Sequence, residues 1–111
     1  MIKEYRNIKR NKIDGFLVAF ATANETGLPY DILLDSLGAE KKHPGCPRVG
    51  VVIGDIVVPV SISEEPIILS GYSFEGSDEI CDWIGQYYIP LRMHWDNNLS
   101  DLEILTIITR A

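Results

Sequence analysis

The sequence has little cysteine and no long apolar segment. Its 111 residues include two cysteines, Cys46 and Cys81, too few for a disulfide-built scaffold, so we expect a reducing compartment, with a single Cys46–Cys81 bridge left open. The longest apolar runs, 16–21 and 56–60, are far shorter than the roughly 20 residues that a membrane-spanning helix needs. The N-terminal segment has no apolar core of the kind found in secretory signal peptides. These absences predict a soluble, cytoplasmic protein.

Motifs of the common enzyme classes are also missing. The chain has no glycine-rich phosphate loop, no GxSxG elbow and no HExxH pair. A cysteine hydrolase would need Cys46 as its nucleophile and His43 or His94 as the base. Pro44 and Pro47 flank Cys46 and favour a loop there rather than a helix N-terminus, which would lower the pKa of the thiol. We therefore expect a non-catalytic protein without a cofactor.

Histidine is as scarce as cysteine, so a metal site would have to use the whole supply of both. Zinc prefers four such ligands, and His43-x2-Cys46 has the spacing of a zinc knuckle. Cys81 and His94, with twelve residues between them, would complete the set, although each has a simpler role on an apolar helix face or at the surface. A small zinc- or thiol-dependent protein is therefore an alternative, with the ligands His43, Cys46, Cys81 and His94.

Positive charge is concentrated at the N-terminus, where residues 1–12 hold five of the ten basic side chains. The total is −6, yet residues 1–12 sum to +4, which leaves −10 for the remainder. Residues 75–103 hold seven acidic side chains and one basic side chain, Arg92. This distribution favours a basic protein partner over nucleic acid, which the acidic part repels. Weak nucleic-acid binding stays an alternative for an accessory protein, through the basic residues Lys3, Arg6, Lys9, Arg10 and Lys12.

Apolar periodicity indicates a single compact α+β domain spanning 1–111. A strand is expected over 16–23, with large side chains on one face and small ones on the other, and a basic edge strand is favoured within 1–13. The strongest signal is a hairpin over 49–62, in which Gly54-Asp55 forms a type II′ turn and pairs 53 with 56, 51 with 58 and 49 with 60. Pro59 places its second strand at a sheet edge or bulge, and 67–69 is a candidate for a further short strand.

Helices are expected at three places. Pro29 and an i, i+3, i+4, i+7 apolar stripe predict one over about 29–37. A second begins after Ser77 as N-cap and ends at Pro90. A third follows the capping box Ser100-Asp101-Leu102-Glu103. The predicted fold is thus α+β, a small antiparallel sheet including the hairpin at 49–62, with two or three helices packed on one face.

The segment 82–96 is the predicted partner-binding site. Residues 83–95 hold four of the ten aromatic side chains, including both tryptophans, and acidic residues flank them. Trp, Tyr, Arg and Met are enriched at the centres of protein interfaces. Trp83 and Tyr87 share a helix face and are expected in the core, which leaves for partner contact the residues Tyr88, Arg92, His94, Trp95, Asp96 and Asp82.

Composition and charge together suggest a small acidic binding protein. The expected role is to inhibit or adapt a basic partner, such as a nucleic-acid-processing protein. In composition, though not in sequence, the chain is similar to inhibitor, immunity and anti-defence proteins of bacteria and phages. A homodimer through the hairpin edge or the aromatic segment is a variant of this hypothesis.

Overall fold

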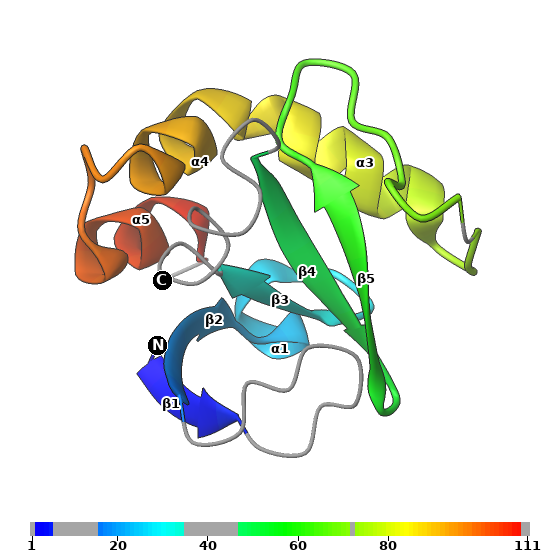
Figure 1. Ribbon diagram of the computed structural model, residues 1–111, viewed down its shortest axis with the longest axis horizontal. Coiled ribbons are helices and arrows are strands. Elements are labelled where there is room, and N and C mark those ends of the chain that lie inside the picture. The colour runs from blue at the N-terminus through cyan, green and yellow to red at the C-terminus, as the bar shows by residue number, and fades with distance from the viewer. Residues whose placement is uncertain (1, 6–15, 35–46, 72, 110–111) are drawn as a thin grey trace.

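The protein is an α+β structure in which helices cover one face of an antiparallel sheet, as predicted (Figure 1). The computed structural model describes residues 2–5, 16–34, 47–71 and 73–109. The sheet has five strands in sequence order: β1 (Ile2–Tyr5), β2 (Phe16–Ala21), β3 (Asp31–Leu34), β4 (Arg48–Ile53) and β5 (Ile56–Ser61). The helices are α1 (Ala23–Thr26), α3 (Ser77–Gln86), α4 (Tyr88–Trp95) and α5 (Asp101–Ile108).

The β4–β5 hairpin has the predicted register. Ile53 pairs with Ile56, Val51 with Val58 and Val49 with Val60. Gly54 has a φ of 63° whereas Asp55 has no positive φ, which is the combination that a type II′ turn requires. The turn therefore sets which valines face the same side of the sheet.

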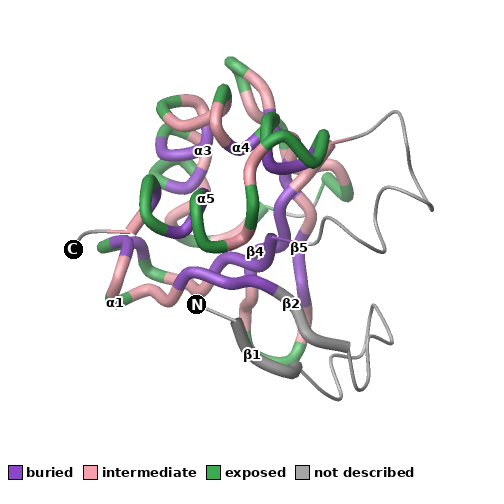
Figure 2. The backbone as a smooth tube through the Cα atoms, turned by 90° about the vertical axis from the view of Figure 1, so that its left-hand side faces the viewer, coloured by how far each residue is buried: buried purple, intermediate pink, exposed green. Residues whose placement is uncertain are grey.

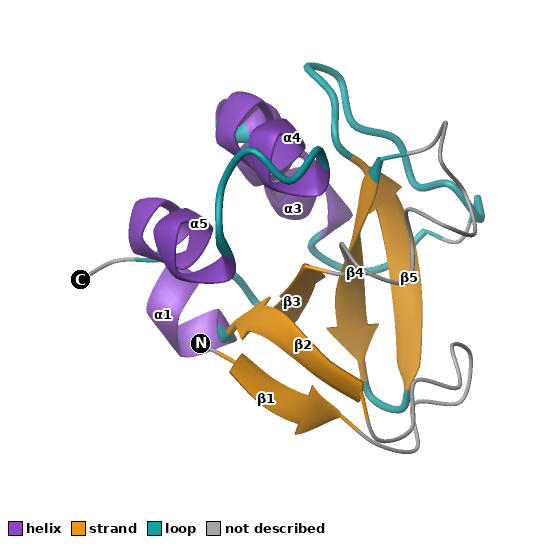
Figure 3. Cartoon of the chain, turned by 60° about the vertical axis from the view of Figure 1, so that its left-hand side comes forward, coloured by secondary structure: helices purple, strands orange, loops and turns teal. Residues whose placement is uncertain are grey.

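The sheet is buried on both faces. On the helix side, sheet residues such as Ala21, Ile32 and Val51 share one core with Ile80, Ile84 and Ile104 of the helices. The three helices α3, α4 and α5 lie together on this side (Figure 3). On the opposite side a smaller buried cluster contains Phe20, Leu33 and Val57. The predicted division of 16–21 into a large and a small face is confirmed at 19–21, where Ala19 and Ala21 belong to the main core and Phe20 does not.

Strand β5 forms one edge of the sheet, as Pro59 indicated. The segment 67–69 lies against that edge as a single bridge, Val60 to Ile68, rather than as a full strand. The Ser61 amide donates to the Ile67 carbonyl at 2.9 Å, and the Leu69 amide donates to the Pro59 carbonyl at 3.0 Å. These bonds occupy the part of the hairpin edge that a second copy of the chain would need for strand pairing.

The helix predicted over 29–37 is wrong, because residues 31–34 form β3, between β2 and β4. Ile32 and Leu34 face the main core while Leu33 faces the smaller cluster. A strand buried on both faces shows a continuous apolar run, and periodicity alone does not separate such a run from a buried helix. Residues 35–37 of that expected helix lie outside the described ranges.

A short helix that the sequence analysis did not predict, α1, precedes β3. Its capping box joins Thr22 and Glu25, and the Asp31 carboxylate accepts a hydrogen bond from the Ala23 amide at 2.8 Å. Asp31 therefore serves as a polar link between α1 and the start of β3, where the sequence reading had placed the first turn of a helix.

Two predicted helix boundaries also need correction. The N-cap of α3 is Gly76, with a φ of 85°, and Ser77 is the first helical residue. Helix α3 ends at Gln86, and Pro90 lies in the first turn of a separate helix, α4. A proline is tolerated there because the amide that it lacks would have no partner within the helix. None of the described helices has the length and apolarity needed to cross a bilayer.

The capping box of α5 is confirmed. The Glu103 amide donates to the Ser100 hydroxyl at 3.1 Å, and the Ser100 amide donates to the Glu103 carboxylate at 2.8 Å. The β-branched residues that favoured a strand are accommodated, since the Thr106 hydroxyl donates to the Leu102 carbonyl within the helix. Burial follows the helical repeat along α3 to α5 (Figure 2), with Ile104, Leu105 and Ile108 of α5 in the core.

Gly50 should tolerate no side chain. A Cβ at this position would lie 2.5 Å from Cγ1 of Val57 on the neighbouring strand, so Gly50→Ala should lower the free energy of unfolding by about 1–3 kcal/mol. Val57→Ala removes the clashing methyl group, and the double variant should therefore be less destabilised than the sum of the two single variants. Urea unfolding of all four proteins measures this coupling. If the losses of unfolding free energy in the two single variants simply add in the double variant, the contact with Val57 does not restrict Gly50.

Candidate functional site

Helix α4 separates its residues into a buried and an exposed side. Leu91, His94 and Trp95 are buried. The exposed positions follow the spacing i, i+3, i+4, i+7 and form what we call the α4 outer stripe, which consists of Ile89, Arg92, Met93 and Asp96. Because helical residues at this spacing share one face, the stripe is a single surface of the helix.

The expectation that His94 and Trp95 lie at the surface is wrong. Their exposed fractions are 5% and 3%, and the guanidinium of Arg48 from β4 lies 5.8 Å from the Trp95 ring centre in a cation–π arrangement. Pro90 indicated the end of a helix, so no helical repeat was expected through 91–96. A helical repeat that starts at Tyr88 places residues 91, 94 and 95 on the side of α4 that faces the sheet.

The other predicted contact residues lie nearer the surface. Tyr88 is half-buried against the core, whereas Asp82, Arg92 and Asp96 are exposed. Arg92 donates to the Asp96 carboxylate at 3.1 Å, one turn along the same helix. Whether these residues bind a partner stays a prediction.

Two residues of the stripe were missed in the sequence reading. Ile89 is 58% exposed and Met93 is 39% exposed, one helical turn apart. The spacing of these two residues was the available signal, and it depends on recognising Pro90 as a first-turn residue of α4 rather than as the end of α3.

Helix α3 presents an acidic surface next to α4 in the chain. Asp78, Glu79 and Asp82 are exposed, and we call them the α3 acidic face. None of the three forms an ion pair with another side chain in the described ranges. Only Tyr87 separates α3 from α4, and the two helices follow one another along the same side of the sheet (Figure 1).

The ligands of the zinc alternative are only partly visible. His43 and Cys46 lie outside the described residues, and so do Arg6, Lys9, Arg10 and Lys12 of the basic segment, while Lys3 falls on β1. Within the described ranges, His, Cys, Asp and Glu form no group of three or more that could hold a metal ion. Cys81 is a free, half-buried cysteine of α3. Burial, followed by the charges of Asp78 and Asp82, raises the pKa of its thiol, so the reactive thiolate is disfavoured.

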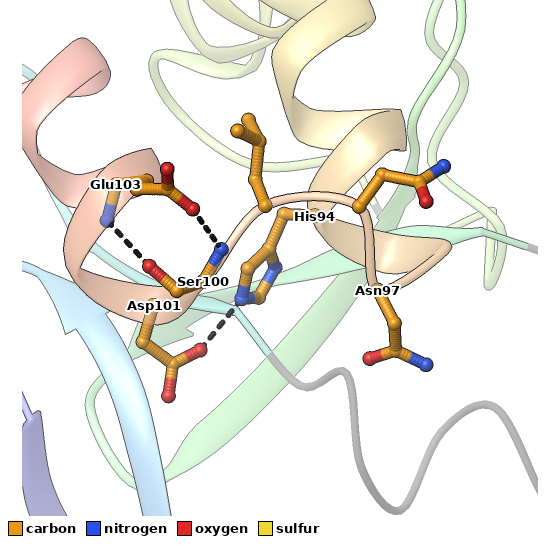
Figure 4. A pocket seen from close by; sticks show the side chains of 7 residues that line it. His94, Asn97, Ser100, Asp101 and Glu103 are labelled. Atoms are coloured by element: carbon orange, nitrogen blue, oxygen red, sulfur yellow. Dashed lines mark hydrogen bonds and ion pairs between the residues drawn. The ribbon is translucent and has the colours of Figure 1, made fainter.

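A polar pocket lies where α4 meets α5 (Figure 4). We call it the α4–α5 pocket; its volume is about 390 Å³ and it is lined by His94, Asn97, Asn98, Leu99, Ser100, Asp101 and Glu103. Asn97 adopts a left-handed φ of 65°, a conformation that asparagine tolerates better than most residues. The residues 97–100 connect the end of α4 to the first turn of α5 around the His94 ring.

The buried His94 is held by a carboxylate from the next helix. Its Nε2 lies 2.6 Å from Oδ1 of Asp101, whose side chain is 42% exposed. A carboxylate only accepts hydrogen bonds, so Nε2 of His94 carries the hydrogen in this pair. Sequence reasoning missed this pair because it joins two helices through a contact that no local motif encodes.

Comparison of the chain with protein-family models, with curated proteins and with solved structures finds no match. The surfaces of the chain itself are therefore the basis for its proposed function.

Acid should weaken the α5 capping box. Hydrogen bonds from the backbone amide and then from the hydroxyl of Ser100 hold the pKa of Glu103 below its ordinary value of 4.5. The stabilisation is therefore complete above the unfolded-state pKa and is lost as pH falls through the lower folded-state pKa. The difference in unfolding free energy between the unmodified protein and Glu103→Gln should shrink between pH 7 and pH 3.

Urea unfolding at several pH values measures this difference. Leu102→Ala is the matched control, because Leu102 is exposed on the same turn and does not titrate. A difference for Glu103→Gln that stays constant over the whole pH range would contradict the expected loss.

Proposed function

We propose that this chain is a non-catalytic binding protein that inhibits or adapts a basic protein partner through helices α3 and α4. The observation that carries the proposal is the pair Ile89 and Met93, both exposed on one face of α4. Helix α4 directly follows α3, whose acidic face is also exposed. On this proposal the partner contacts exposed apolar side chains of α4 and negative charges of α3.

The apolar part of this surface suits a protein partner. Isolated exposed apolar residues are common on proteins and need no explanation. Ile89 and Met93 are one turn apart, however, and a methionine side chain adapts readily to a partner's shape. Burying both would exclude water from the centre of the contact, which is where most binding energy is concentrated at protein interfaces.

The charge of this surface supports a basic partner. Asp78, Glu79 and Asp82 point their charge to solvent without a compensating base in the described ranges, and the whole chain carries −6. Arg92 of the stripe is paired with Asp96, which offsets its charge locally. Such a field accelerates encounter with a positively charged surface and repels nucleic acid.

Proteins that process nucleic acids carry basic surfaces for phosphate contacts, so they match the proposed partner in charge. An acidic protein seated on such a surface would block access to it without any chemistry of its own. This is the mode of action that we propose, in the manner of small acidic inhibitors from bacteria and phages.

Removing the apolar centre of the stripe should weaken partner binding. The chain is used to capture its partner from the source cells, and the identified partner is then purified and titrated against variants. Ile89→Ala with Met93→Ala should weaken the complex by about 10- to 100-fold, while leaving the melting temperature within a few degrees because both side chains are exposed. Ile67→Ala is the matched control, since Ile67 is 61% exposed but lies after β5.

The same titration has outcomes that would refute the proposal. Equal affinity of the double variant and the unmodified protein would remove the stripe from the interface. A captured partner without a basic surface, or one whose binding does not weaken with salt, would remove the electrostatic part of the argument.

Replacing a carboxylate of the α3 acidic face should act mainly on the association rate. Asp82→Asn should slow association with the purified partner several-fold at low salt and leave dissociation nearly unchanged, because steering acts before contact. The effect should fade at 0.5 M salt. Stopped-flow or surface binding kinetics separate the two rates, and an effect confined to dissociation would contradict steering.

A further inference from the structure

Met93 is the one methionine within the described residues, and it lies in the middle of the α4 outer stripe. The chain has two methionines, and the other, Met1, lies outside those residues. The Met93 side chain is 39% exposed. It belongs neither to the main core nor to the half-buried residues packed against that core. Reagents dissolved in the solvent therefore reach this side chain.

The described cysteine is a poorer target for oxidants than Met93. A cysteine reacts with a peroxide through its thiolate. Cys81 is half-buried, and burial, followed by the charges of Asp78 and Asp82, raises the pKa of its thiol. A thioether has no proton to lose, so its reactivity does not depend on such a pKa. Among the described sulfur atoms, exposure and chemistry therefore direct a peroxide to Met93.

We propose that Met93 is an oxidative modification site, at which conversion to the sulfoxide by a peroxide releases the partner. In this step a lone pair of the thioether sulfur attacks one oxygen of hydrogen peroxide. The S–O bond forms as the O–O bond breaks, and the second oxygen leaves as water with both protons of the peroxide. The sulfur loses two electrons and the peroxide gains them.

A sulfoxide is costly at the centre of an apolar contact. Its S–O group is polar and accepts hydrogen bonds, and burial between apolar side chains leaves it without a donor. The unmodified thioether of Met93 has no such cost, and its flexible chain fills irregular gaps in a contact. Ile89, one turn away on the same face, stays apolar. Oxidation therefore weakens the contact without removing all of it.

This role of Met93 rests on the proposed function, because only a side chain that the partner buries can transmit its oxidation to binding. The α3 acidic face contains no sulfur, so its attraction for a basic surface should be unaffected. Oxidation is thus expected to act on the dissociation rate, in contrast to Asp82→Asn. A methionine sulfoxide reductase with a dithiol as reductant would reverse the change.

The full-length protein is treated with hydrogen peroxide, and peptide mass spectrometry locates the added oxygen. We expect it on Met93, at a rate comparable with that of N-acetyl-methionine amide, with the melting temperature nearly unchanged. The oxidised protein is then titrated against the purified partner. Its affinity should fall by about tenfold through faster dissociation, and treatment with the reductase should restore it.

Met93→Leu is the matched control variant. Leucine keeps the volume and the apolar character of methionine but has no sulfur, so binding should persist and become insensitive to peroxide. The variant retains Cys46 and Cys81. A loss of binding that peroxide still causes in this variant would come from a thiol or another group and would overturn the assignment to Met93. Met93→Gln, a polar side chain of similar length, should weaken binding without any oxidant.

The remaining outcomes separate the modification site from the proposed function. A Met93 that resists peroxide while other groups react, or a large fall in melting temperature on oxidation, would overturn the site. Unchanged affinity of the oxidised protein, together with loss of binding in the Ile89 and Met93 double alanine variant, would refute the site and leave the proposed function standing. Normal binding by the double variant would refute the proposed function, and the release of a partner with it.

Discussion

The helix-facing side of the sheet has to be covered, and this constraint shapes the rest of the molecule. Strands β2 to β5 present buried apolar side chains such as Ala21, Ile32 and Val51 on that side. Three short helices cover them, and each must turn its apolar side inward to do so. The inward residues Ile84, Leu91 and Ile104 are fully or almost fully buried. The residues exposed on α3 and α4 are therefore those left over once the apolar sides of these helices face the sheet.

The junction of α4 and α5 illustrates how a polar group is accommodated in this layer. His94 lies on the inward side of α4, where an unpaired polar ring would be costly. Asp101, the first residue of α5, accepts its hydrogen bond at 2.6 Å, and the adjoining capping box holds that first turn in place. The bond joins the two helices. The same contact thus serves the packing of the helices and lies in the wall of the α4–α5 pocket.

Local chemistry explains which parts of the fold were predictable. The β4–β5 hairpin was predicted to the residue, because a Gly-Asp turn and paired valines specify register over a few positions. The α5 capping box was equally clear, since its two reciprocal hydrogen bonds involve residues three apart. Strand β3 was misread as a helix because its apolar residues face two cores, and a run buried on both sides has no periodicity of its own. The metal alternative stays a prediction, as His43 and Cys46 lie outside the described ranges.

The amino-acid sequence by itself determined the charge distribution, the hairpin and the start of α5, because each depends on composition or on neighbours a few residues away. Only the tertiary structure decided which side of α4 faces outward. Trp95 and His94 were expected at the surface and lie inside, while Ile89 and Met93 take the exposed positions. The physical reason is that burial of a helix face depends on the sheet beneath it, and the residues of that sheet are distant in the chain. The pairing of His94 with Asp101 was decided in the same way, by the packing of one helix against the next.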